Sequence, residues 1–247
     1  MPDRLEAISA VARPGFNALL EDVFGLNVRG LRTLRDLYVH PRRVFDSARV
    51  IDWANQHTPT IRLTFSLITV YMLLSFFWAA DDGPLYQSLF AQLEQAVIQN
   101  PDLPPAEDMI EGWFAAYSFS FPFVYMFVHF IAGSLLFVWG KGTSWTTRLR
   151  LYFGLLAVSM SLSLAVTLLM PFLTVDQLLF YSLSSSLLSI VAYAVTYGRG
   201  MAGIHSGVAL WWRAPLVALF IGVTDILIAV MTSIGSGFWM QRAIGLG

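Results

Sequence analysis

Two ionisable side chains, His129 and Asp225, stand inside long apolar stretches, and they are the residues best suited to chemistry within a membrane. His129 lies ten residues before Trp139, and Asp225 lies ten residues after Pro215, so helical geometry places each about 15 Å from the same boundary. A charged side chain at that depth costs about 2.5 to 3.5 kcal/mol on insertion scales. Asp225 is therefore expected to face other helices, either paired with His129 or neutral and hydrogen-bonded to hydroxyls such as that of Thr224.

Hydroxyl side chains recur at helical spacing in the two apolar stretches that separate His129 from Asp225. The two stripes are Ser159, Ser163 and Thr167, and Ser182, Ser186 and Ser189. Small polar residues let helices approach closely and bond across the contact, typically for about 0.6 to 2 kcal/mol each, so close helix packing is the favoured interpretation. A hydrophilic path for a substrate is the alternative.

Three functional classes follow from these residues. A buried acid is what proton coupling needs, which makes a small proton-linked transporter one hypothesis. His129 could instead hold a tetrapyrrole as a lone axial ligand, and the nine aromatic residues between Trp113 and Phe130 could bind a quinone or a carotenoid. Because aromatics alternate there with a period of two, they surround the whole helix, so part of them must face lipid or another protein. Ordinary packing is favoured, and we predict no resident cofactor.

The sequence contains no motif typical of an enzyme. Its four histidines include no i, i+4 pair, and it has no cysteine, so neither a zincin site nor a thiolate ligand is available. A G-x-S-x-G elbow, a Walker loop and a dinucleotide fingerprint are also missing from the sequence. We therefore predict a protein without catalytic activity and without a metal site.

Five apolar segments, each about 20 residues long, are expected to position these side chains as membrane-spanning helices. They are Ile61 to Ala80, Trp113 to Val138, Leu151 to Phe172, Leu178 to Tyr197 and Pro215 to Ile234. Gly235-Ser236-Gly237 is expected to be a flexible exit from the last one. With 56% apolar and 13% charged residues, the composition also indicates an all-α integral membrane protein. We expect residues 61–247 to form the transmembrane domain and residues 1–60 to form an N-terminal region on the cytoplasmic surface of the membrane.

The basic residues predict the orientation, because Lys and Arg gather in cytoplasmic segments. Of 15 basic residues, all but Arg242 fall in residues 1–62 or in the segments 140–150 and 198–213. The segment 81–112 has seven acids and no basic residue. We predict a cytoplasmic N-terminus, an outside C-terminus and a bacterial inner membrane as the location.

The N-terminal region has the pattern of interfacial amphipathic helices. Val28, Leu31 and Leu34 recur at helical spacing, and Pro41 is expected to end one helix and begin a second. Its arginines serve topology and solvation, or alternatively bind lipid headgroups or a partner. The headgroup candidates are Arg29, Arg32, Arg35, Arg42 and Arg43.

The external acidic loop, residues 81–112, is expected to carry a short amphipathic helix that starts at Pro84 and ends near Asn100. It is too short to form a domain of its own. A role in capping the bundle or docking another subunit fits it better than cation storage, because its acids lack the spacing of a calcium loop.

The order of these features resembles the Yip-type family of five-span membrane proteins and a related bacterial five-span family. The likeness lies in His40-Pro41-Arg42-Arg43-Val44-Phe45 before the first span, Gly140-Lys141-Gly142 after the second, and Tyr197-Gly198-Arg199-Gly200-Met201 after the fourth. The resemblance implies a non-enzymatic helper in membrane organisation or complex assembly, and it carries over no functional residues.

The leading functional prediction is therefore an accessory, assembly or organising subunit of a larger membrane complex. Its expected partners are membrane lipids and other membrane protein subunits, in a homo- or hetero-oligomer, and not nucleic acid. A proton-linked transporter using Asp225 with His129, and a cofactor-holding subunit, are the alternatives.

Overall fold

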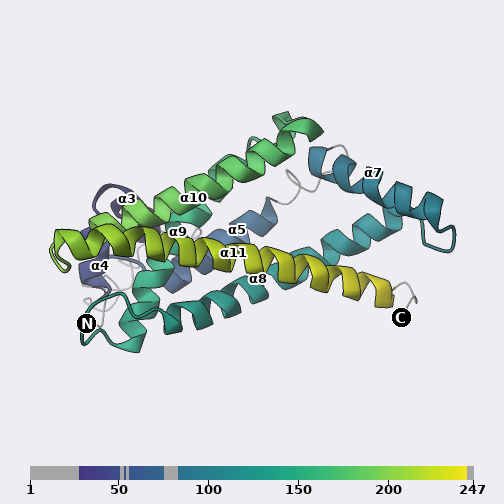
Figure 1. Ribbon diagram of the computed structural model, residues 1–247. Helices are drawn as coiled ribbons and strands as arrows, with labels where there is room; N and C mark the ends of the chain where they lie inside the picture. Colours follow the sequence, from purple (N-terminus) through teal and green to yellow (C-terminus); the bar gives the residue numbers. More distant parts are fainter. Residues whose placement is uncertain (1–27, 51–52, 54–55, 75–82, 244–247) are drawn as a thin grey trace, which may run out of the picture.

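The computed structural model describes residues 28–50, 53, 56–74 and 83–243, and this part of the chain is all-α (Figure 1). Short helices gather at the two ends of a bundle of long ones. In chain order the helices are α3 Val28–Val39, α4 Pro41–Ser47, α5 Thr60–Leu73, α7 Pro84–Gln99, α8 Ala106–Leu135, α9 Trp145–Thr167, α10 Leu178–Gly200 and α11 Gly207–Ala243, with 3-10 turns at Met170–Phe172 and Val175–Gln177.

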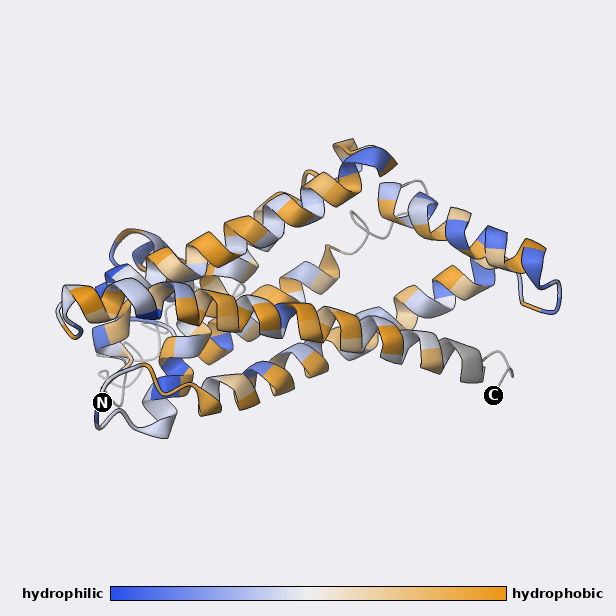
Figure 2. Cartoon of the chain, viewed as in Figure 1, coloured by the Kyte–Doolittle hydropathy of each residue, from blue (hydrophilic) through white to orange (hydrophobic). Residues whose placement is uncertain are grey.

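Four of these helical stretches are long and apolar enough to cross a membrane: Ala106–Leu135, Trp145–Phe172, Val175–Gly200 and Gly207–Trp239. Figure 2 shows apolar residues along the lengths of α9, α10 and α11, whereas hydrophilic residues gather at the ends of the bundle and on α7. The remaining predicted span, Ile61 to Ala80, corresponds to α5, which has 14 residues and is too short by itself to cross a ~30 Å core. The end of that predicted span lies outside the described residues, so a fifth span stays a prediction.

Proline positions predicted several helix boundaries correctly. α3 ends at Val39, α4 has Pro41 in its first turn, and α7 begins at Pro84 and ends at Gln99. Val44 and Phe45 of α4, and Ala48 directly after it, are buried where this segment meets the bundle.

The last helix is longer than the predicted span Pro215 to Ile234, which it contains, and the predicted flexible exit after that span was wrong. α11 begins at Gly207, eight residues before Pro215, and it continues through Gly235-Ser236-Gly237 to Ala243. In an apolar medium every unpaired backbone group costs several kcal/mol, so a helix that keeps its hydrogen bonds is favoured even across glycine and proline. The segment 235–237 is therefore part of the helix and not a flexible exit.

Threonine hydroxyls hold the short helix α5 against α9. The Thr64 hydroxyl donates a hydrogen bond to the carbonyl of Phe153 over 3.0 Å, and the Thr60 hydroxyl donates to the carbonyl of Arg150. α8 and α11 run side by side along the bundle, and α10 lies against both α9 and α11 (Figure 1). The core of this arrangement is centred on α9, whose residues Leu151 to Met160 are all buried.

The end of α10 fits against α4 so closely that it requires a glycine. A Cβ atom at Gly200 would lie 2.5 Å from Cε2 of Phe45, a ring that is itself buried.

Gly200→Ala is expected to destabilise the protein by about 1 to 3 kcal/mol, the usual cost of overpacking. The measurement is the apparent melting temperature in detergent. Gly235→Ala, where a Cβ would meet nothing within 4 Å, is the control and should leave that temperature unchanged or raise it. Equal melting temperatures for the two variants would contradict this account of the contact.

Candidate functional site

His129 on α8 and Asp225 on α11 are hydrogen-bonded to each other inside the bundle. Nε2 of His129 lies 3.0 Å from Oδ1 of Asp225. The histidine side chain is fully buried, whereas 30% of the aspartate side chain is exposed. The equal depth that the sequence indicated therefore corresponds to a direct contact between the two helices.

Two tyrosines extend this pair into a network of four side chains. The Tyr193 hydroxyl, from α10, donates a hydrogen bond to Oδ2 of Asp225 over 2.8 Å. The Tyr152 hydroxyl, from α9, lies 2.9 Å from Nδ1 of His129. Four different helices thus each supply one side chain. We call His129, Asp225, Tyr152 and Tyr193 the buried network.

One arrangement of protons satisfies every contact of the buried network. If Tyr152 donates to Nδ1, then His129 is neutral and its Nε2–H donates to Asp225, which also accepts from Tyr193. Each of these contacts then pairs a donor with an acceptor, and the four side chains together carry one negative charge. In the other arrangement His129 carries a second proton, its Nδ1–H donates to the Tyr152 oxygen, and the network is neutral. The two arrangements differ by a single proton.

Close packing fixes the position of the Tyr152 ring. A Cβ atom at Gly133, one turn beyond His129 on α8, would lie 2.9 Å from two ring atoms of Tyr152, so only glycine leaves room for the ring there. On the other side, the Tyr125 ring meets the imidazole edge-on, with 4.3 Å between their centroids. Both contacts hold His129 in the orientation that its two hydrogen bonds require.

Asp225 faces a cavity of about 450 Å³ between the helices, which is open on the side where Ser182 and Ser186 of α10 are exposed. Five of the six residues in the two predicted hydroxyl stripes line this cavity, and Thr167 is the exception. The others are Ser159, Ser163, Ser182, Ser186 and Ser189. Tyr71, Tyr117, Phe121 and Tyr125 add an aromatic wall. The stripes therefore surround an open space near the buried acid, in addition to lying where helices pack. We call this space the serine cavity.

The aromatic segment of α8 divides as its period of two predicts. Tyr117, Phe121 and Tyr125 point into the bundle and contact one another, with ring centroids 5.4 and 5.5 Å apart. Phe119 and Phe123 lie on the outer surface, 70% and 64% exposed. The aromatics thus supply one wall of the serine cavity and one surface for lipid.

Thr224 reaches the buried network through Tyr152 and not as the hydrogen-bond partner that the sequence suggested for Asp225. The Thr224 hydroxyl donates to the carbonyl of Phe220 in its own helix, 2.8 Å away, and its side chain also makes a hydrogen bond with Tyr152. The roles of Tyr152 and Tyr193 were missed, because their sequence positions reveal nothing about which helices meet. Among the described residues no group of three or more His, Asp or Glu side chains is arranged to hold a metal ion.

The arginines predicted to bind headgroups are all exposed on α3 and α4. Two of them have carboxylate partners: Arg35 lies 2.8 Å from Asp36, and Arg42 lies 3.7 Å from Asp46. Their role as a lipid site stays a prediction.

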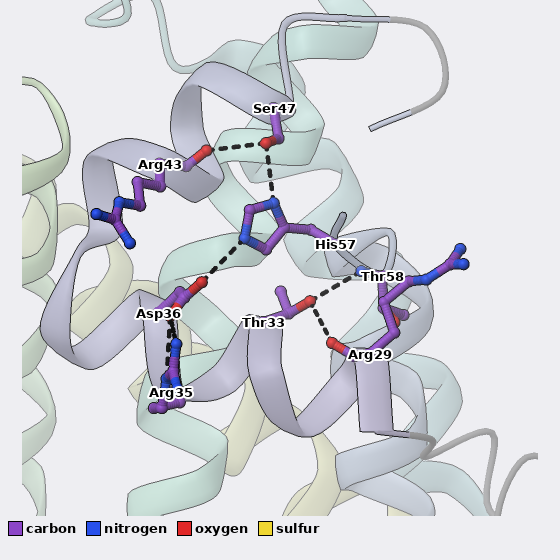
Figure 3. Close-up of polar contacts among 8 residues, drawn as sticks. All are labelled: Arg29, Thr33, Arg35, Asp36, Arg43, Ser47, His57 and Thr58. Carbon is purple, nitrogen blue, oxygen red and sulfur yellow. Dashed lines mark hydrogen bonds and ion pairs between the residues drawn. The ribbon is translucent and has the colours of Figure 1, made fainter. Parts of the chain in front are cut away.

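A second buried polar cluster joins α3, α4 and the segment before α5 (Figure 3). Nδ1 of His57 lies 2.8 Å from the Ser47 hydroxyl, and its Nε2 lies 3.3 Å from Oδ2 of Asp36. The Ser47 hydroxyl also donates to the carbonyl of Arg43, and Ser47 is only 7% exposed. Although Asp, His and Ser are the residue types of hydrolase triads, this hydroxyl is already engaged and covered. We interpret the cluster as a clamp between segments.

The clamp predicts a dependence of stability on acid pH. Burial acts to raise the pKa of Asp36, but hydrogen bonds from Arg35 and His57 outweigh it and hold that pKa below its ordinary value of 3.8. The ionised form is thus the stable one in the fold. The contribution of Asp36 is therefore fully present above about pH 4 and is lost as the pH falls through the lowered pKa. Apparent melting temperatures of wild type and Asp36→Asn should differ at pH 6 and converge towards pH 3, and a constant difference across this range would refute the assignment.

Comparison of the whole chain with protein-family models, with curated proteins and with solved structures finds no significant match.

Proposed function

We propose that this chain is a multi-pass protein of a bacterial inner membrane that carries a small, positively charged polar solute in exchange for a proton. The observation that supports this most is the buried network: an acid hydrogen-bonded to a histidine among apolar helices, at the edge of a hydroxyl-lined cavity that opens to the surface of the bundle. Intramembrane acids are costly, and they are retained mainly where ions or protons are moved.

The charge of the buried network suggests how proton and solute would exchange. With a proton bound, the network is neutral and matches its apolar surroundings. Without it, the network carries one negative charge beside the serine cavity, which a cationic solute would compensate. The serine hydroxyls would accept hydrogen bonds from an amine, and the rings of Tyr117 and Tyr125 would favour a cation through their π-faces. Binding a solute cation would therefore release the proton.

The proposed topology has five spans, with the N-terminus in the cytoplasm and the C-terminus outside. α5 is the start of the first span in this proposal. The positions of Lys and Arg support this orientation, since 14 of 15 lie on one side of it.

An accessory or assembly subunit is the second candidate function, and one observation favours it. On α10, Ser182 and Ser186 are exposed although they lie in an apolar helix, beside strongly exposed Leu179 and Phe180. A helix from another subunit could pack closely against this surface. The resemblance to Yip-type proteins points in the same direction and stays a prediction.

Flux through the purified protein in vesicles tests the first proposal. Proteoliposomes with a pH-sensitive dye inside would receive amines, neutral amino acids or sugars from outside. We expect certain amines, and not sugars, to move protons outwards at a rate that empty vesicles do not show. If no solute in the panel moves protons and the protein purifies from its native membrane with stoichiometric partners, the accessory role is the better account.

A further inference from the structure

A second cavity, of about 610 Å³, lies at the end of the bundle that carries α4. Arg49 follows α4, Lys141 lies between α8 and α9, Arg148 is in the first turns of α9, and Arg213 is in the first turns of α11. None of the described residues that line it is acidic. Segments that are distant in the sequence thus bring four cationic residues around one space, which we call the basic cavity.

These cations have no carboxylate partners among the described residues. Nε of Arg148 donates to the carbonyl of Thr143 over 3.1 Å, and its guanidinium lies 4.3 Å above the centre of the Phe137 ring. Arg49 makes a weak contact of 3.8 Å with the sulfur of Met201. Four positive charges around one space with no acidic residue in its lining make the basic cavity attractive to an anion.

Two buried donors without acceptors belong to the same cavity. Nε of Arg213 and Nε1 of Trp139 have no hydrogen-bond partner, and they are two of the three such side-chain atoms found in the described part of the chain. Buried donors are satisfied in the great majority of cases, so each unsatisfied one indicates a missing acceptor. Both residues line the basic cavity. An anion rich in oxygen atoms would supply acceptors and negative charge together.

His205 lines the basic cavity but adds no positive charge to it. Burial, and then the neighbouring Arg213 guanidinium, lower its pKa, so it is neutral near pH 7. Its Nε2–H can then donate to the carbonyl of Val138, 2.9 Å away, while Nδ1 accepts from Nη1 of Arg213 over the same distance. The imidazole therefore orients Arg213 and leaves its Nε unused.

We propose that the basic cavity binds a phosphate-bearing anion, which Arg49, Arg148 and Arg213 hold through charge-assisted hydrogen bonds. Guanidinium groups match the oxygens of a phosphate in pairs. The cavity lies where α8 has ended and α9 and α11 begin, and Phe137, which lines it, is 70% exposed. An anionic phospholipid would place its headgroup among the arginines and its acyl chains along such exposed apolar residues. A soluble phosphate compound shares the chemistry but has no use for the apolar surface.

The test measures binding to the delipidated full-length protein in detergent by thermal shift. The probes are phosphatidylglycerol, phosphatidylcholine and inorganic pyrophosphate. We expect phosphatidylglycerol to raise the melting temperature and phosphatidylcholine to have no effect. If pyrophosphate alone raised the melting temperature, the cavity would still be a phosphate site, and its ligand would be a soluble phosphate compound and not a phospholipid. Equal shifts by phosphatidylglycerol and phosphatidylcholine, or no shift by any probe, would overturn the proposal.

Variants locate the binding in the cavity. Arg49→Gln combined with Arg213→Gln should weaken phosphatidylglycerol binding about 10-fold or more. Since Arg213 also contacts His205, Lys141→Gln is the second variant: its side chain makes no hydrogen bond or ion pair within the described part of the chain, and the change should weaken binding about 3-fold without altering the fold. Arg62→Gln, an exposed arginine of α5 that lies outside the cavity and is not one of the headgroup candidates, is the matched control. Losses no larger than that of Arg62→Gln would place the site elsewhere and overturn the proposal.

Discussion

Asp225→Asn protein in vesicles is expected to lose proton-coupled solute flux by roughly 100-fold or more, comparable to the removal of an acid–base group in an enzyme. An amide has nearly the shape of a carboxyl group, so the substituted side chain can still accept a hydrogen bond from His129. It cannot bind or release a proton near neutral pH. The buried network would then keep its geometry and lose the titratable group beside the serine cavity. Dye-filled proteoliposomes, compared at equal protein content, measure the effect.

Asp176→Asn is the matched control for this experiment. Asp176 lies in an exposed 3-10 turn before α10, far along the chain from the buried network, and its amide variant should keep full flux. If Asp225→Asn transported as well as the control, the carboxyl would serve packing alone. That result would refute proton coupling through Asp225 while leaving the fold untouched.

Removing His129 alone is expected to destabilise the protein by about 3 kcal/mol, and removing both His129 and Asp225 should cost much less than the sum of the two single losses. A buried pair that loses one partner leaves a polar group unsatisfied, typically at a cost of about 3 to 5 kcal/mol. The lower end applies here, because 30% of the Asp225 side chain is exposed to the cavity. His129→Leu, Asp225→Leu and the double variant form a double-mutant cycle, and reversible unfolding in mixed detergents supplies the free energies of unfolding.

The exposed pair of Arg42 and Asp46 provides the comparison for that cycle. The two residues are four apart on α4, 3.7 Å separates their charged atoms, and more than half of each side chain is exposed. Their interaction is expected to be about 0.5 kcal/mol or less. An interaction energy between His129 and Asp225 no larger than this would mean that the hydrogen bond in the core contributes nothing to folding.

The helices at the membrane surface could be predicted closely from the sequence, because local rules determine their limits. Pro41 and Pro84 cannot lie in a helix interior without losing a hydrogen bond, so each begins a helix. The same kind of local rule failed at Gly235-Ser236-Gly237, where a flexible exit was expected, since apolar surroundings favour a continuous helix that keeps its hydrogen bonds. The limits of helices inside the membrane thus depend on the solvent as well as on the residue.

The candidate site was predictable only in part. Depth along two helices identified His129 and Asp225, because distance from a boundary follows from residue number alone. Tyr152 and Tyr193 reach them from α9 and α10, and their contribution depends on how four helices rotate and pack. Gly133 illustrates the difficulty: its lack of a side chain places the Tyr152 ring, and nothing in the sequence around it indicates that partner.

The number of protons released when a solute binds tests the central claim most directly. Isothermal titration calorimetry of the purified protein, carried out at one pH in buffers of different ionisation enthalpy, gives this number without any vesicle. The amine that drives flux should release close to one proton from wild type and none from Asp225→Asn. Binding of that amine to wild type with no proton released, at a pH where the buried network is protonated, would contradict exchange of a solute cation for a proton at Asp225.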